Sequence, residues 1–278
     1  MSTSSQLPKV TKTVLSADPV IQRGLRHTAE GRATAAKAID SANTLLHGAG
    51  SAYRLYPSWS AKPARAASAV PVYLVATYPA ARTTPAAVPV GCTCAFVNPE
   101  SFASWIARHG TGSGRLELDQ ARLLGFMLLH EVGHLVKNST GMDFENGDLS
   151  ELNTDPSIAK AHEEEADEFA SDVVRKVMLS KPVSDASLEA NWVATALVEL
   201  SWNMQANRSL DEFGATAIGK PAVFFDPNLS HPNLDWRILR SNYLIQQTPQ
   251  AKELLDSFEE ARHRGENPRP LYEASPSK

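Results

Sequence analysis

A strongly apolar pattern lies between residues 119 and 141, where hydrophobic side chains occupy most faces of a predicted helix. Asp119 is a suitable N-cap, and Asn138-Ser139-Thr140-Gly141 ends the pattern. A helix that is apolar on most faces is expected to be buried. It contains His130-Glu131-Val132-Gly133-His134, and burying these polar side chains without partners would be costly. That cost favours a bound metal ion.

The spacing of the two histidines supports the same interpretation. His130 and His134 are four residues apart, so on a helix they lie one turn apart on one face. Their imidazole nitrogens can then reach one metal ion at about 2.0–2.1 Å each. Glu131 is placed to reach a metal-bound water, and Gly133 leaves room beside the second ligand. The pattern is that of a zinc-hydrolase helix, although an ordinary amphipathic helix can carry the same residues.

An acidic helix is predicted over 156–178, with Asp155 as N-cap and Pro156 in its first position. Glu163 and Asp167 are four residues apart and share one face of it. A catalytic zinc site needs a third protein ligand and an open position for water. We expect Glu163 to be that ligand and Asp167 to accept the outer N–H of a ligating imidazole. The alternative is a run of solvated glutamates paired with neighbouring cations.

Hydrophobic periodicity elsewhere predicts more helices and a small sheet. Ala166 and Ala170 are small enough for the acidic helix to pack closely and antiparallel on the metal helix. Pro71 places its strand at a sheet edge or a strand start. An edge strand there would bind an extended peptide, or the sheet would only support the helices. Trp192 and Trp202 are predicted to lie in the core. The further helices are expected at 20–47, 101–109, 187–207, 231–247 and 251–263, and the strands at 70–75 and 94–97.

These elements predict an α+β, mainly α-helical fold with a small sheet packed on the helix of His130. We expect a single domain over 19–263, in which 19–50 is a helical N-terminal extension. Residues 1–18 and 264–278 are expected to be flexible ends.

Composition and charge exclude several other classes of protein. The chain has 27 basic and 31 acidic residues, a net charge of −4, which argues against a nucleic-acid-binding surface and a polybasic membrane patch. The apolar stretch 83–97 is too short to span a bilayer, and we expect no secretion signal, because residues 1–17 lack a charged start and an apolar middle. Cys92 and Cys94 are predicted to lie too far apart on one strand for a disulfide. We therefore expect a soluble cytoplasmic protein.

A third motif, Ser230-His231-Pro232, is followed by Arg237 six residues after the histidine (237 − 231). Together, HExxH, ExxxD and HPxxxxR resemble the gluzincin metallopeptidases. The most similar group is the CAAX prenyl-protease and bacterial heat-shock membrane-protease family, with its soluble minimal relatives. The resemblance implies a zincin-like core and one zinc ion held by His130, His134 and Glu163. It also implies Glu131 as general base, and His231 and Arg237 near the scissile carbonyl and the substrate backbone.

The resemblance covers only the stretch from about Cys94 to Arg240, and typical members of the family carry transmembrane helices that this chain lacks. Its 29-residue separation between His134 and Glu163 is more like that of compact soluble gluzincins. The expected function is a soluble zinc-dependent endopeptidase acting on peptides or proteins. One alternative is a non-catalytic zincin-fold regulatory or protein-binding module, and another is a zinc amidase. Glu131 favours catalysis, because structural zinc sites usually close with four protein ligands and need no base.

Overall fold

Helices dominate the part of the chain that the structure describes. The computed structural model describes residues 29–60, 68–74, 85–88, 93–109, 119–137, 156–217 and 234–264. In chain order these residues form α3 (Ala29–Gly48), β1 (Tyr53–Pro57), β2 (Ser68–Leu74), β3 (Ala86–Ala87), β4 (Ala95–Val97), α4 (Pro99–His109), α5 (Gln120–Lys137), α6 (Pro156–Met178), α7 (Asp185–Ala217), α8 (Leu234–Gln246) and α9 (Pro249–Arg264). The predicted α+β, mainly helical composition is confirmed.

Helix α5 is the central element of the core and begins as predicted. The Asp119 carboxylate accepts a hydrogen bond from the backbone N–H of Arg122 at 3.1 Å, which caps the helix. Leu124 and Leu128 share one face of α5, and Leu129 lies on a neighbouring face. All three are fully buried, so the helix is enclosed on more than one side. It ends at Lys137, and the predicted stop at 138–141 lies outside the described residues.

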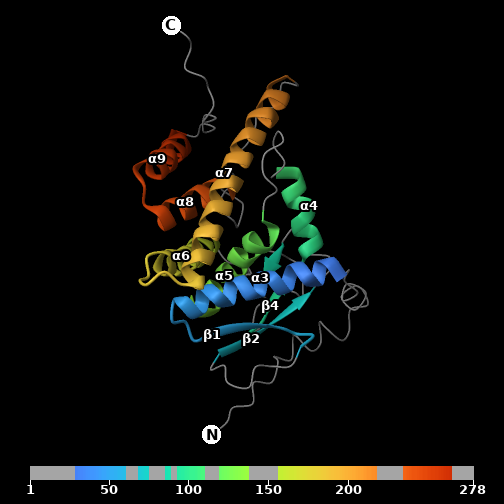
Figure 1. Ribbon diagram of the computed structural model, residues 1–278. Helices are drawn as coiled ribbons and strands as arrows, with labels where there is room; N and C mark the ends of the chain where they lie inside the picture. Colours follow the sequence, from blue (N-terminus) through green and yellow to red (C-terminus); the bar gives the residue numbers. More distant parts are fainter. Residues whose placement is uncertain are drawn as a thin grey trace.

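Helix α3, predicted as an extension, packs along α5 and belongs to the same core (Figure 1). A Cβ at Gly125 would lie 3.1 Å from the backbone oxygen of Ala38, so glycine permits this close approach. Ala38, Leu45 and Leu46 on α3 are fully buried. Residues 19–28 of the predicted extension lie outside the described residues.

The sheet has the order β1-β2-β4-β3. The β1-β2 and β2-β4 pairs are parallel, and β3 pairs antiparallel with β4. The prediction that Pro71 marks a sheet edge or a strand start is wrong for the strand as a whole, since β2 starts at Ser68 and lies between two neighbours. Pro71 is opposite Tyr56 of β1, and pairing with β4 begins only at Val72. At Pro71 itself the strand therefore has one neighbour, and the missing N–H is tolerated there.

The sheet lies against the helical layer beside α5. Strands β3 and β4 contact α5, while β1 contacts α3 (Figure 1). Leu55, Val70, Val72 and Val97 are buried in the same hydrophobic core as these helices. The prediction of a small sheet packed on the helix of His130 is confirmed.

Helices α6 and α8 complete the neighbourhood of α5. Helix α6 packs on α5, and α8 packs on both α6 and α7. Arg175 of α6 donates to the backbone oxygen of Ile245 at the far end of α8, at 3.1 Å. A second hydrophobic cluster joins α8 to α9 through Trp236, Leu239, Leu255 and Phe258. Helix α8 is thus held on one side by α6 and on the other by α9.

Two predictions about single residues are wrong. Trp192 was expected in the core, but it is 58% exposed, and the Arg122 guanidinium lies 5.5 Å from its ring centroid. Helical periodicity places Trp192 beside Leu188, which is also exposed, so both lie on the outer face of α7. Helix α7 also continues to Ala217, ten residues beyond the predicted end at 207. The side chain of Trp202 lies outside the described residues.

The expectation of no disulfide between the cysteines is also wrong. Cys94 is disulfide-bonded, and Cys92 is the only other cysteine in the chain. The prediction assumed that both cysteines lie on one regular strand, where side chains two apart are held at a fixed separation. Strand β4 begins only at Ala95, so this spacing does not apply at Cys94. Cys92 itself lies outside the described residues.

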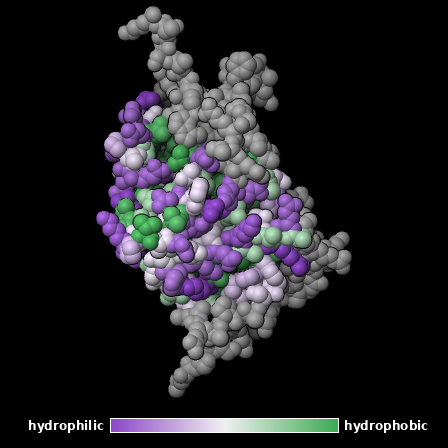
Figure 2. All heavy atoms as spheres, in the orientation of Figure 1, coloured by the Kyte–Doolittle hydropathy of each residue, from purple (hydrophilic) through white to green (hydrophobic). Residues whose placement is uncertain are grey.

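The visible surface is mixed in character. Figure 2 shows small hydrophobic patches separated by hydrophilic residues on one face of the molecule. Among the described helices, none is both long and apolar enough to cross a membrane.

Candidate metal centre

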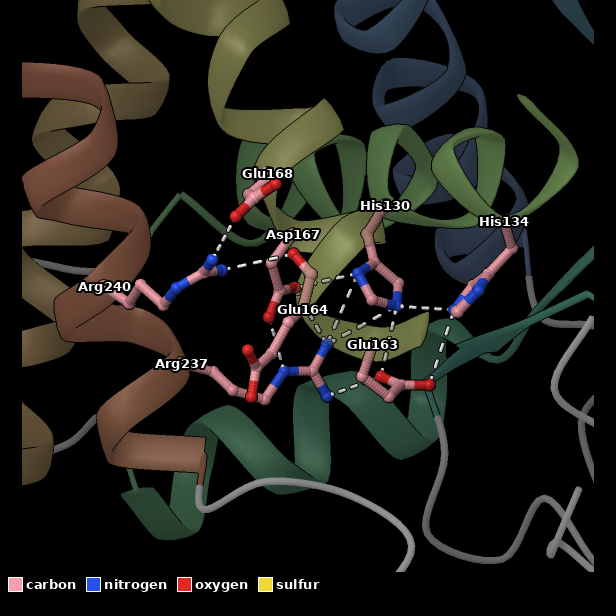
Figure 3. A network of polar contacts seen from close by, with 8 residues as sticks. All are labelled: His130, His134, Glu163, Glu164, Asp167, Glu168, Arg237 and Arg240. Carbon is pink, nitrogen blue, oxygen red and sulfur yellow. Dashed lines mark hydrogen bonds and ion pairs between the residues drawn. The ribbon is translucent and has the colours of Figure 1, made fainter. Parts of the chain in front are cut away.

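Two helices bring His130, His134 and Glu163 together (Figure 3). The Nε2 atoms of His130 and His134 are 3.0 Å apart. Glu163 Oε2 lies 3.4 Å from His130 Nε2, and Glu163 Oε1 lies 3.4 Å from His134 Nε2. All three residues are buried, with at most 7% of each exposed. One ligand atom from each residue lies within 4.8 Å of the others, which makes them a group that can hold a metal ion.

The donor atoms of this group fit a divalent metal ion. Ligands about 2.0–2.1 Å from one ion in a tetrahedral site are about 3.3–3.4 Å from one another. The observed separations of 3.0, 3.4 and 3.4 Å are close to that value. Two imidazoles and one carboxylate suit zinc, and the same donors also occur around non-haem iron(II). Geometry and donor chemistry thus agree on a metal site without identifying the metal.

Asp167 orients the first histidine. Its Oδ1 atom lies 2.8 Å from His130 Nδ1, so that nitrogen donates to the carboxylate and Nε2 is the one directed at the metal group. Burial lowers the pKa of His130, but the nearby carboxylates of Asp167 and Glu163 outweigh it and raise the pKa to about 10. Burial also opposes ionisation of Asp167, yet Arg237 and His130 hold the pKa of Asp167 at about 2. The predicted role of Asp167 agrees with this contact.

Charge balance in the buried cluster is compatible with a bound divalent cation. Metal ligation requires neutral imidazoles. Among the described residues, the remaining charged groups of the cluster are the carboxylates of Glu131, Glu163 and Asp167 and the guanidinium of Arg237, all of them buried or largely buried. With these groups ionised, the sum is three negative charges and one positive charge, or −2. An uncompensated buried charge is costly, and a divalent ion would neutralise this one.

Close packing of α5 on α6 sets the distance between the ligands. A Cβ at Gly133 would lie 2.9 Å from both the Cα and the backbone oxygen of Ala166. His130 contacts Asp167 while His134 contacts Glu163, so the two helices run antiparallel, as predicted. Gly133 is therefore required for Glu163 to come within reach of both histidines.

Replacing Gly133 by alanine is expected to destabilise the protein by about 1–3 kcal/mol, because the added methyl overpacks the helix interface. Without that contact, glycine to alanine within a helix would stabilise the protein by about 0.5–1 kcal/mol. The test compares the melting temperatures of Gly133→Ala and the unchanged protein, and we expect the variant to melt at the lower temperature. A higher melting temperature for Gly133→Ala would show that the two helices are not in close contact at this position.

Glu131 is buried in the same cluster but is not one of the three grouped donors. It is 5% exposed, and both histidines are close enough for their charges to act on it. Burial raises the pKa of Glu131, with charges on both histidines acting in the opposite direction. A buried carboxylate with a raised pKa, beside a metal group, is suited to accept a proton.

Arg237 reaches the cluster from α8; the resemblance had implied a place for it near the scissile carbonyl and the substrate backbone. Its guanidinium nitrogens are engaged with protein carboxylates. Nε lies 2.7 Å from Asp167 Oδ2, Nη2 lies 2.9 Å from Asp167 Oδ1, and Nη1 lies 2.8 Å from Glu163 Oε2 (Figure 3). The pairing of Arg237 with both acids was not predicted. His231 and Asp155 lie outside the described residues.

The fold and the site define a mainly helical α+β protein with a buried His-His-Glu group that can hold a metal ion. Comparison of the chain with models of known protein families, with curated proteins and with solved structures finds no match. The resemblance to the gluzincins therefore depends on the motifs themselves.

Proposed function

We propose that this protein is a zinc-dependent endopeptidase of the gluzincin type, in which His130, His134 and Glu163 hold one zinc ion. The observation that carries the proposal is the burial of Glu131 beside a group of three metal donors that does not include it. A structural metal site has no need for a further buried carboxylate, whose burial is costly. A hydrolytic site needs one as a base.

The protein's own groups account for the proton transfers of amide hydrolysis. A zinc ion held by this group would supply an activated water and a Lewis acid for the substrate carbonyl. Glu131 takes a proton as the water oxygen bonds to the carbonyl carbon. It then returns the proton to the nitrogen as the carbon–nitrogen bond breaks, which releases a carboxylic acid and an amine. Asp167 keeps the proton of His130 on Nδ1, so that Nε2 remains available to the metal.

The small sheet supports a peptide as the substrate. Among the described strands, β3 lies at the edge of the sheet, and it contacts α5, the helix that carries both histidines. An extended peptide can pair with such an edge through backbone hydrogen bonds, which gives affinity with little demand on sequence. Because β3 contains only Ala86 and Ala87, this edge also presents little side-chain bulk to a bound chain.

Metal analysis and a peptide assay together test the proposal. We expect about one zinc per purified chain, as a site with three protein ligands requires. We also expect cleavage of an unstructured protein such as casein, lost on chelation and restored by zinc. Mass spectrometry of the fragments would locate the cleaved bonds.

Each other outcome identifies an alternative. Iron in place of zinc would overturn the choice of metal, since the same donors bind iron(II). Bound zinc without cleavage of any peptide would favour the non-catalytic module. Zinc-dependent hydrolysis of small amides, with peptides left intact, would favour an amidase.

A further inference from the structure

Arg237 makes contacts with the metal group that differ from those of a substrate-binding residue. All three nitrogens of its guanidinium lie within 2.9 Å of carboxylate oxygens of Asp167 or Glu163. The side chain is only 15% exposed. A guanidinium is a planar fork with five N–H donors, suited to hold carboxylates in fixed positions. Its strongest interactions are therefore with the protein itself.

The two carboxylates that Arg237 engages have different tasks at the metal group. Glu163 Oε2 is shared between Arg237 Nη1, at 2.8 Å, and His130 Nε2, at 3.4 Å. Asp167 Oδ1 is shared between Arg237 Nη2, at 2.9 Å, and His130 Nδ1, at 2.8 Å. Arg237 thus fixes one oxygen of the third donor residue and one oxygen of the carboxylate that orients the first donor.

We propose that Arg237 is a positioning residue that clamps Glu163 and Asp167 in the geometry needed for metal binding, and that it does not act on the substrate. This inference rests on the proposed zinc site. The guanidinium of Arg237 also supplies the positive charge that allows the two buried carboxylates to lie side by side. Helix α8 therefore contributes to metal retention although it provides none of the three grouped donors.

Arg240 offers a closely matched control on the same helix. It lies three residues after Arg237 and is 14% exposed, against 15% for Arg237. It also links α8 to α6, through the Glu168 carboxylate and the backbone oxygen of Glu164. The structure gives Arg240 no contact with His130, His134, Glu163 or Asp167 among the hydrogen bonds and ion pairs of the described residues. Comparison of the two arginines separates the clamp from simple docking of the helix.

The experiment measures zinc affinity by competition with a chromophoric chelator for the full chain and for Arg237→Gln, Arg237→Lys and Arg240→Gln. We expect Arg237→Gln to bind zinc about 10–100-fold more weakly, the usual effect of losing a partner of a metal ligand. Arg237→Lys should recover only part of this loss, because an ammonium lacks the planar fork. Arg240→Gln should change the affinity by no more than about threefold, because its carboxylate partner is half exposed.

Two results would overturn the inference. Unchanged zinc affinity in Arg237→Gln with a lower kcat would instead place Arg237 on the substrate. Equal losses in Arg237→Gln and Arg240→Gln would show that the effect comes from docking of α8. If Arg237→Gln fails to fold, Arg237→Lys decides the question, and full affinity in that variant would refute the clamp.

A double-mutant cycle adds a measurement that a general structural role would not affect. If Arg237 acts through Asp167, the losses in zinc affinity for Arg237→Gln and Asp167→Asn should be markedly non-additive. Additive losses would refute action through Asp167. Because all these measurements concern metal binding, failure of the protein to cleave peptides would refute the proposed function and leave the test of Arg237 valid.

Discussion

Glu131→Gln is expected to lower the rate of peptide hydrolysis by about 10²–10⁴-fold, the contribution of a positioned general base. Glutamine has the same shape as glutamate but cannot accept the proton. It should also be at least as easy to bury, because it carries no charge. Zinc content should stay at about one per chain, because Glu131 is not among the three grouped donors. Steady-state kinetics measures the rate, and metal analysis of the same preparation measures the zinc content.

Glu165→Gln is the matched control for this prediction. Glu165 is an exposed glutamate on α6, close in sequence to Glu163, and the same substitution there should leave both zinc content and rate unchanged. Retention of full hydrolytic activity by Glu131→Gln would remove Glu131 from the mechanism. Loss of zinc in that variant would show that Glu131 helps to hold the metal.

Glu163→Ala is expected to weaken zinc binding by more than about 100-fold, because loss of an outer partner alone costs about 10–100-fold. The substitution removes one of the three grouped donors and leaves a buried space beside two histidines. Isothermal titration or chelator competition measures the affinity, and hydrolysis should fall with zinc occupancy. The melting temperature should also lose its dependence on added zinc, since a ligand stabilises a folded protein only as far as it binds.

Glu164→Ala is the corresponding control. Glu164 is the next residue on α6 and is partly exposed. Within the described part of the chain, its hydrogen bond to α8 uses the backbone oxygen, which the substitution retains. Zinc affinity close to that of the unchanged protein is expected. Equal losses in Glu163→Ala and Glu164→Ala would mean that the helix as a whole, rather than the Glu163 carboxylate, governs metal binding.

The metal group was predictable because its residues fall into two pairs, and the members of each pair are close together in the sequence. His130 and His134 lie one turn apart on one helix, as do Glu163 and Asp167, so spacing alone places each pair on a common face. The small residues Gly133 and Ala166 then indicated which faces meet. In the structure these two faces do meet, because Gly133 lies against the backbone of Ala166.

Features that depend on tertiary packing were not predictable in the same way. The pairing of Arg237 with Asp167 and Glu163 requires α8 to lie along α6, which no local pattern records. Trp192 looked like a core residue because tryptophan usually is, but neighbouring elements decide which face of α7 is covered. Pro71 sits in a central strand because β4 pairs with β2 only beyond it, a matter of register between distant segments.

The contact at Gly133 has a consequence for how the metal group tolerates change. The atoms nearest to a Cβ at this position include the main-chain Cα and oxygen of Ala166, which have no rotamer to adjust. The distance between the donor atoms is thus set by direct contact between the backbones of the two helices. Side chains elsewhere on the surface of the protein can therefore vary without altering the separation of these donor atoms.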